Sequence, residues 1–129
     1  MSDSIQSTGK LSPERLTALF AAIDAKDSAA FAGFLTEDGR FRFGSAPEVR
    51  GRKDVATAVD AFFETIAGLS HDISMTMQNG STVVCEGEVS YTRHDGSSIS
   101  LPFADVFELV GDEIADYKIY MDIAPLYAN

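Results

Sequence analysis

The sequence predicts an α+β domain, with three N-terminal helices packed on one face of a curved, mostly antiparallel sheet. Two observations support this prediction. In most of the chain before residue 68, apolar residues recur every three or four positions, as on one face of a helix. From residue 71 onward they alternate with polar residues, as in strands that bury one face. A sheet that curves under helices encloses space, so we expect an internal apolar pocket.

Length, charge and composition restrict both the size of the fold and its partners. With 129 residues, of which 45% are hydrophobic, the chain suits one domain that buries roughly two-thirds of its unfolded surface. We expect a flexible tail at residues 1–11 and the domain at residues 12–129. The net charge of −10 disfavours binding to nucleic acids and to anionic membranes.

The sequence shows no targeting or membrane signal. Its first residues lack the basic start and apolar centre of a signal peptide, and no apolar run reaches the roughly 18 residues of a membrane span. We therefore expect a cytoplasmic protein that is not inserted in a membrane. The lone cysteine and the two histidines form no cluster with the spacing of a metal site. We expect neither a metal nor a cofactor.

Three helices are expected, each with its own start or stop signal. Ser12 caps the first, which continues with apolar residues at helical spacing. Asp27 caps a shorter second helix, and Gly39 is expected to end it in a left-handed conformation. A third helix is expected over residues 52–67, with Gly68 after its last turn.

Strands are expected in most of the remaining segments, separated by short turns that contain glycine. They cover residues 40–43, 71–78, 83–92, 99–110 and 114–122. On each of them the odd-numbered residues are mainly apolar, so these residues are expected to face inward. Residues 44–51 contain Gly, Pro and Ser and are expected to form a loop.

Two turns test whether these strands can pair with their odd-numbered residues on one face. Directly paired residues share a face, so a hairpin between such strands needs an odd number of loop residues. The three-residue loop that ends in Gly96 meets this condition and places Asp105 opposite Cys85. The turn at Gly111 requires either an odd loop or a bulge.

Asp105 fits its position least well. It lies in an apolar row of the strand 99–110, where a carboxylate costs several kcal/mol unless it is paired, hydrogen-bonded or protonated. His71 shares the inward face from a neighbouring strand, and a neutral imidazole there could exchange a proton with Asp105. We expect Asp105 and His71 to be the catalytic residues. The alternative is structural, because a lone histidine on an apolar face is more often a core residue.

The other inward-facing side chains are large and apolar or aromatic, and we expect them to line the pocket. They are Phe41, Phe43, Phe62, Met75, Val89, Tyr91, Phe103, Tyr117, Ile119 and Met121. The two tyrosines in this set carry hydroxyl groups that could contact a ligand, although core packing is the simpler explanation for both. Sequence alone does not separate core residues from residues that line a pocket.

Four motifs, spread over nearly the whole chain after the tail, carry a resemblance to a known family. They are the first helix running into AAIDAKDSAAFAGFLTEDGRFRF, the segment VRGRKDVATAVDAFF, the junction GLSHDI and the closing YKIYMDIAPL. Together they resemble the nuclear transport factor 2-like superfamily and, within it, the SnoaL-like branch. The resemblance implies a cone-shaped domain with an apolar pocket, commonly dimeric, but it implies no single chemistry.

Comparison with two groups of enzymes in that superfamily limits which catalytic roles the resemblance implies for residues of this chain. Asp105 resembles the strand aspartate that donates a hydrogen bond in ketosteroid isomerases, but their base falls on Phe43 and their tyrosine donor on Leu19. In limonene epoxide hydrolases an acid on the last strand corresponds to Ile119 here. Neither mechanism can be transferred whole to this chain.

The leading hypothesis is a SnoaL-like small-molecule enzyme that performs cofactor-free acid/base chemistry on an apolar, ring-bearing substrate. Its reaction would be of isomerase, cyclase, dehydratase or hydrolase type, with Asp105 as base or protonated donor and His71 as its partner. Two alternatives stay open: a non-catalytic binding module for an apolar small molecule, and a dimerisation domain with a vestigial pocket. A homodimer is also expected, as the resemblance implies.

Overall fold

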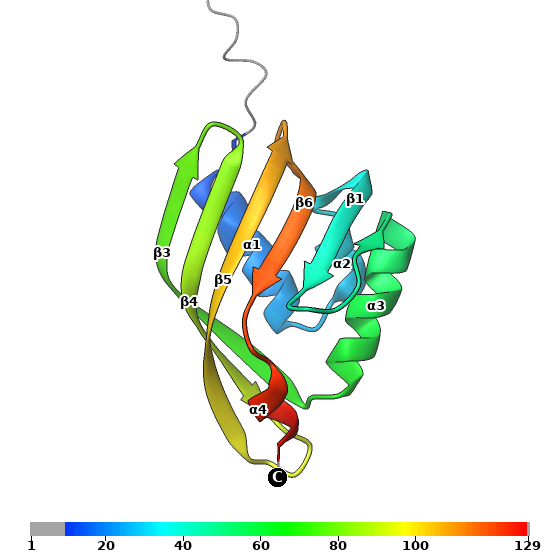
Figure 1. Ribbon diagram of the computed structural model, residues 1–129, viewed down its shortest axis with the longest axis vertical. Coiled ribbons are helices and arrows are strands. Elements are labelled where there is room, and N and C mark those ends of the chain that lie inside the picture. Colours follow the sequence, from blue (N-terminus) through cyan, green and yellow to red (C-terminus); the bar gives the residue numbers. More distant parts are fainter. Residues whose placement is uncertain (1–9, 129) are drawn as a thin grey trace, which may run out of the picture.

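The computed structural model describes residues 10–128, which form a six-stranded sheet with helices packed on one face (Figure 1). The helices are α1 (Pro13–Asp24), α2 (Ser28–Ala32), α3 (Arg52–Glu64) and α4 (Ala124–Tyr127). The strands are β1 (Leu35–Phe43), β2 (Val49–Arg50), β3 (Gly68–Asn79), β4 (Thr82–Thr92), β5 (Ser98–Val110) and β6 (Glu113–Tyr120). The predicted α+β class is confirmed.

The sheet is curved and mostly antiparallel, as predicted, and it is open. Its strand order is β2-β1-β6-β5-β4-β3. The pair of β1 and β6 is parallel, and all other neighbours are antiparallel. Helices α1 and α2 cross behind the sheet in Figure 1, α3 lies beyond β1, and α4 lies near the hairpin of β4 and β5. The core therefore lies between the helices and the inner face of the sheet.

Most of the tail expected at residues 1–11 lies outside the described residues, but its last two residues belong to the fold. The backbone N–H of Lys10 donates to the carbonyl of Gly111 over 2.9 Å. Leu11 is 9% exposed and packs in the hydrophobic core. Lys10 and Leu11 therefore both contact the folded domain.

The second helix is shorter than expected, and the strand after it is longer. Asp27 caps α2 as predicted, by accepting from the backbone N–H of Ala30 over 3.0 Å. Residues 37–39, however, lie within β1, and Gly39 has no left-handed φ. A Cβ at Gly39 would lie 2.9 Å from the Cβ of Leu35, so this glycine permits close packing. Pairing with β6 extends β1 beyond the alternating pattern that predicted it.

The other helical predictions need smaller corrections. Helix α3 ends at Glu64, and Gly68 is the first residue of β3 and does not stop the helix. The expected loop at residues 44–51 contains β2, which pairs with β1. The short helix α4 was not predicted. Among the described residues, no helix has the length and hydropathy needed to cross a membrane.

The predicted register of the long strands is confirmed around Asp105. Cys85 of β4 is its partner, as the loop argument required. The irregularity expected near Gly111 is a bulge at Ala115, because residues 114 and 116 of β6 pair with adjacent residues of β5. Before the bulge Ile114 faces inward, and after it the odd-numbered Tyr117 and Ile119 do, as predicted for these two residues.

A second bulge overturns the position predicted for Met75. Ser74 is an extra residue between two successive register pairs of β3 and β4, and the alternation of faces is inverted after it. Met75 then pairs with Glu86 and shares the outer face with it. Met77 lies on the same face and is 60% exposed. Both methionines are therefore removed from the pocket wall.

Candidate functional site

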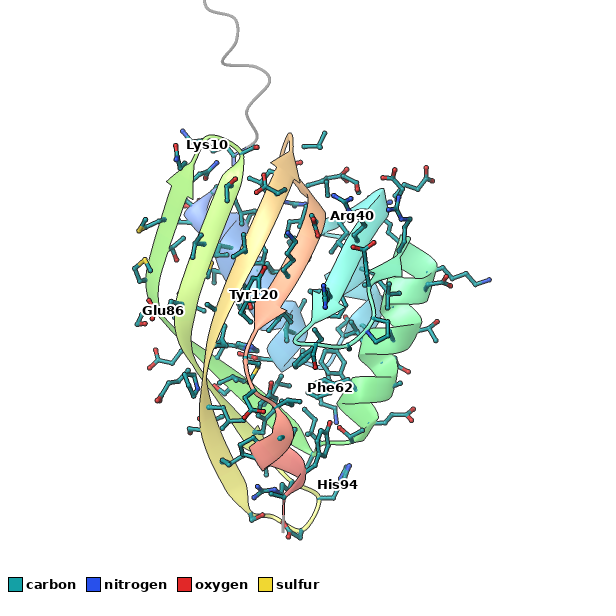
Figure 2. All side chains as sticks on the ribbon, in the orientation of Figure 1. Lys10, Arg40, Phe62, Glu86, His94 and Tyr120 are labelled. Carbon is teal, nitrogen blue, oxygen red and sulfur yellow. The ribbon has the colours of Figure 1, made fainter. Side chains whose placement is uncertain are left out.

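A cavity of about 310 Å³ lies between the inner face of the sheet and the helices. Every predicted pocket residue except Met75 lines it, namely Phe41, Phe43, Phe62, Val89, Tyr91, Phe103, Tyr117, Ile119 and Met121. In Figure 2, Phe62 lies between α3 and the sheet. The exposed residues Ala46, Pro47 and Tyr127 also line the cavity and mark its outer end. The wall is apolar, apart from a few aromatic and titratable side chains.

Asp105 lies at the buried end of this cavity. Alternation along β5 turns its side chain inward, and the residue is 2% exposed. The hydroxyl of Tyr117, on the neighbouring strand β6, donates to Oδ2 over 3.2 Å. Oδ1 has no hydrogen-bond partner. Among residues 10–128 it is the only buried side-chain oxygen or nitrogen that lacks one. An unpartnered buried oxygen beside a cavity is available to a ligand.

Burial raises the pKa of Asp105 to about 8, and the hydrogen bond from Tyr117 opposes this rise only in part. No lysine or arginine of the described chain lines the cavity to compensate a negative charge. At neutral pH the carboxyl group is therefore mostly protonated. Because Tyr117 donates to Oδ2, the proton belongs on Oδ1, where it can be donated to a molecule in the cavity.

His71 lines the same cavity, but its partner is Asp24 and not Asp105. The ring nitrogen Nδ1 lies 2.6 Å from Oδ1 of Asp24, at the end of α1. The backbone N–H of His71 donates to the other oxygen of the same carboxylate over 3.1 Å. A carboxylate accepts only, so Nδ1 carries the hydrogen and Nε2 keeps its lone pair. The expected direct partnership of His71 with Asp105 is replaced by this contact.

The ring of His71 is held between two phenylalanines. Its centroid lies 5.0 Å from that of Phe20 on α1 and 5.2 Å from that of Phe103 on β5. Burial lowers the pKa of His71, and this effect exceeds the opposing influence of Asp24. The imidazole is therefore neutral at pH 7. Its Nε2 makes no hydrogen bond to any residue from 10 to 128 and is free to accept a proton.

The two titratable groups occupy separate parts of the cavity. His71 pairs with Val89, which pairs with Leu101, and Leu101 precedes Asp105 by four residues on β5. The spacing of strands places the two Cα atoms about 10 Å apart across the sheet and about 13 Å apart along it. A single proton cannot pass directly between these side chains. Any coupling between them needs a molecule in the cavity.

The remaining hydroxyl groups of the cavity are already engaged. Tyr91 donates to Sδ of Met121 over 3.8 Å, and burial raises its pKa. Burial also raises the pKa of Tyr117 well above its ordinary value. The hydroxyl of Tyr127 lies 2.9 Å from the hydroxyl of Thr65, the residue that follows α3. The tyrosines therefore contribute polar edges to an apolar wall.

Sequence reasoning missed Asp24 and Tyr127. Asp24 follows Phe20 by four positions, so it shares the stripe of α1 that faces the sheet, and this spacing was the available signal. Tyr127 lies on a helix that no pattern predicted. Among the described residues, no three histidine, cysteine, aspartate or glutamate side chains lie together as a metal site would need.

Comparison with known proteins agrees with this architecture. The family model of the SnoaL-like domain matches residues 16–117. A search of curated proteins finds none that matches the chain.

Three solved structures illustrate the fold. An NTF2-like protein of unknown function from Burkholderia pseudomallei is 17% identical, with a TM-score of 0.78, covering 98% of this chain and 95% of that one. A Xanthomonas campestris protein provisionally named a polyketide cyclase is 21% identical, with a TM-score of 0.77 and coverages of 86% and 90%. An epoxide hydrolase of the LEH-like type from M. tuberculosis is 18% identical, with a TM-score of 0.72 and coverages of 87% and 83%. At these identities the likeness shows the fold alone.

Proposed function

The chain belongs to the SnoaL-like domain family, and we propose that it is a small-molecule enzyme performing cofactor-free acid/base chemistry on an apolar, ring-bearing substrate. One observation carries this proposal. The same apolar cavity contains a neutral imidazole backed by a carboxylate and a neutral carboxylic acid with a free oxygen. Enzymes separate acid and base roles in this way, by giving two groups environments that move their pKa values apart.

His71 would be the base. Its Nε2 takes a proton from the substrate, and the carboxylate of Asp24 holds the ring and stabilises the imidazolium that forms. Asp24 is thus a positioning residue, since it acts through His71. Burial keeps the imidazole unprotonated at pH 7, which a base requires.

Asp105 would be the acid. Protonated Oδ1 donates to an oxygen of the substrate as negative charge develops there. If a proton leaves a carbon next to a carbonyl, its electron pair moves onto the carbonyl oxygen and is stabilised by this hydrogen bond. Return of the proton to another carbon completes an isomerisation. In a dehydration, the electron pair instead forms a carbon–carbon double bond as the C–O bond to a hydroxyl group on the next carbon breaks, and this group takes the proton and leaves as water. Cyclase and hydrolase reactions use the same acid and base.

A screen of ring ketones tests the proposal, with hydrogen–deuterium exchange next to the carbonyl as the readout by NMR. We expect His71→Gln to slow exchange by at least about 100-fold. Asp24→Asn should slow it as well, because the ring loses the group that fixes its tautomer. His94→Gln is the matched control, since His94 lies on an exposed turn and contacts the carbonyl of Glu64. Unchanged exchange in His71→Gln would refute the role of His71.

A second candidate function is a binding module that encloses an apolar molecule without converting it. The unpartnered Oδ1 of Asp105 favours it, because one hydrogen bond to a ligand satisfies this atom whether or not chemistry follows. Native mass spectrometry of the freshly purified protein distinguishes the two. Retention of a ligand, together with no exchange on any ketone, would favour the binding module.

A homodimer also stays part of the proposal, through the outer face of the sheet. Figure 2 views this face, which carries Glu86 and the half-exposed Tyr120. Arg42 and Lys118 are register partners near one edge, and Asp72 and Glu88 are partners near the other. A two-fold axis parallel to the strands would place the basic edge of each copy on the acidic edge of its partner.

Light scattering tests this arrangement. Tyr120→Glu should shift the protein towards monomer, and Lys53→Glu on the exposed side of α3 should not. A wild-type protein that is monomeric throughout would remove both the homodimer and the alternative of a dimerisation domain. A cytoplasmic location stays a prediction.

A further inference from the structure

Building on the proposed function, we propose that the substrate is an uncharged molecule with two fused rings and an oxygen acceptor, and that the cavity rejects the corresponding carboxylate. Three features of the cavity support this substrate class. They are its volume, the separation of its two polar groups, and the absence of a cationic side chain from its described wall.

The volume sets the size of the ligand. An apolar protein cavity of about 150 Å³ holds one benzene molecule. The cavity here, at about 310 Å³, is close to twice as large. Two fused six-membered rings therefore fill it. A third ring would have to project past Ala46, Pro47 and Tyr127 into solvent, where its apolar surface stays wet.

The positions of the polar groups indicate the same size. His71 and Asp105 are separated by two strand spacings and four residues along β5. A single six-membered ring is too short to contact both side chains, even when both extend into the cavity. Two fused rings with an oxygen substituent reach further, with the oxygen at Oδ1 of Asp105 and the opposite edge towards Nε2 of His71. The ring of Phe103, which contacts His71, lies along this path.

The charge of the wall excludes anions. A carboxylate in the cavity would lose its water and gain no lysine or arginine, and the single neutral donor on Asp105 would not replace its hydration shell. The net charge of −10 adds a weaker, long-range repulsion. A ligand cation would have to remove the proton of Asp105 and form a buried ion pair, whose desolvation offsets most of the attraction. An uncharged oxygen acceptor meets the protonated Oδ1 without either penalty.

Calorimetric titration with a matched pair of probes tests the charge requirement. Methyl 2-naphthoate and 2-naphthoate have the same rings, but at pH 7 only the second is charged. We expect the ester to bind at least 100-fold more tightly than the carboxylate. Asp105→Asn replaces one neutral hydrogen-bonding group with another, so the difference should persist. Its loss in this variant would mean that a charge on Asp105, and not the lack of a cation in the wall, causes it, and would overturn the inference. Asp116→Asn alters an aspartate on the other face of the sheet and should leave the difference unchanged.

Two further esters test the size requirement. Methyl benzoate, with one ring, and the methyl ester of 2-anthracenecarboxylic acid, with three, should each bind at least tenfold more weakly than methyl 2-naphthoate. Binding of the carboxylate as tight as that of its ester would overturn the inference. So would equal affinity for the three-ring ester, or no detectable binding of the two-ring ester at its solubility limit.

This experiment separates the inference from the proposed function. The esters report binding and need no turnover. If the expected order of affinities holds while no ketone undergoes exchange, the substrate class stands as a ligand class and the enzyme proposal fails. If exchange depends on His71 but the carboxylate binds best, the enzyme proposal stands and this inference fails.

Discussion

Two buried aspartates lie on neighbouring strands, Asp105 on β5 and Asp116 on β6, but they face opposite sides of the sheet. Asp116 is 8% exposed on the outer face, and Oδ2 lies 3.2 Å from a guanidinium nitrogen of Arg40 and 3.8 Å from Nζ of Lys118. Asp105 is 2% exposed on the inner face and has only the hydroxyl of Tyr117. The fold compensates the charge of one aspartate and leaves the other without a cation. The uncompensated aspartate is the one beside the cavity, as expected of a site kept for a ligand at the expense of stability.

Replacing Asp105 should have the largest effect on stability. Its pKa rises from 3.8 in the unfolded chain to about 8 in the fold. The folded state therefore keeps a proton that the unfolded state releases, and stability falls as the pH rises between these two values. Asp105→Asn removes this decrease in stability, because the amide does not titrate. We expect the free energy of unfolding of the variant to exceed that of wild type by about 2–4 kcal/mol near pH 8. This gain is smaller than the free energy that corresponds to the full pKa shift, because the buried amide also lacks a hydrogen-bond partner.

Urea unfolding of both proteins from pH 5 to pH 9 measures this difference. The gain should grow with pH and level off above about 8. A variant that is several kcal/mol less stable than wild type at pH 7 would mean that Asp105 holds the structure together. The enzyme proposal would then lose its main support.

Tyr117→Phe sharpens the comparison by removing the one hydrogen bond that Asp105 has. Both carboxyl oxygens would then be buried without a partner, at a cost of about 1–2 kcal/mol. Because this hydrogen bond lowers the pKa of Asp105, its loss should raise that pKa above its present value of about 8. Carboxyl carbon NMR with selectively labelled aspartate measures the titration. Tyr91→Phe is the control, since Tyr91 donates to Met121. An equal upward shift in both variants would refute a specific effect of the hydrogen bond.

Asp116→Asn should have a smaller effect, and in the opposite direction from Asp105→Asn. It removes the negative partner of Arg40 and Lys118, so we expect a loss of about 1 kcal/mol. Salt screens pairs near the surface, so this loss should shrink at about 1 M salt. The gain in Asp105→Asn should change little with salt, because no cation lies beside Asp105. Urea unfolding at low and high salt measures both. A salt-independent loss in Asp116→Asn would contradict the stabilisation of Asp116 by Arg40 and Lys118.

The smallest effect on stability is expected at Asp24, a half-buried carboxylate whose partner is a histidine. Its charge raises the pKa of His71 against the larger effect of burial, so Asp24→Asn should lower that pKa further. His71 stays neutral at pH 7 in both proteins. Since its folded pKa lies below 6.5, His71 favours the folded state above pH 6.5, and this contribution is lost as the pH falls through its folded pKa. NMR titration of the His71 ring follows the change, and an upward shift in the variant would contradict the assigned contact.

Local patterns were sufficient for the sheet and for the acid in it. Alternation along β4 and β5 predicted which side chains face inward, and the parity of one loop predicted the pairing of Asp105 with Cys85. These predictions succeed because successive side chains on a strand must point to opposite faces. Met75 was misplaced because the bulge at Ser74 has no distinctive residue, and a single extra residue inverts every later position on the strand. The length of β1 was underestimated because β6, far along the chain, supplies its hydrogen bonds.

The sequence by itself determined the α+β class, the family, and the burial of an aspartate among apolar residues on β5. Only the tertiary structure decided the partners of the polar groups. Asp24 and His71 are 47 residues apart and meet because α1 packs across β3. Tyr117 reaches Asp105 because β6 pairs with β5. Periodicity reports which face of an element is buried, because burial acts on each residue separately. A contact between two side chains depends on how whole helices and strands pack together, and local sequence patterns do not predict this packing.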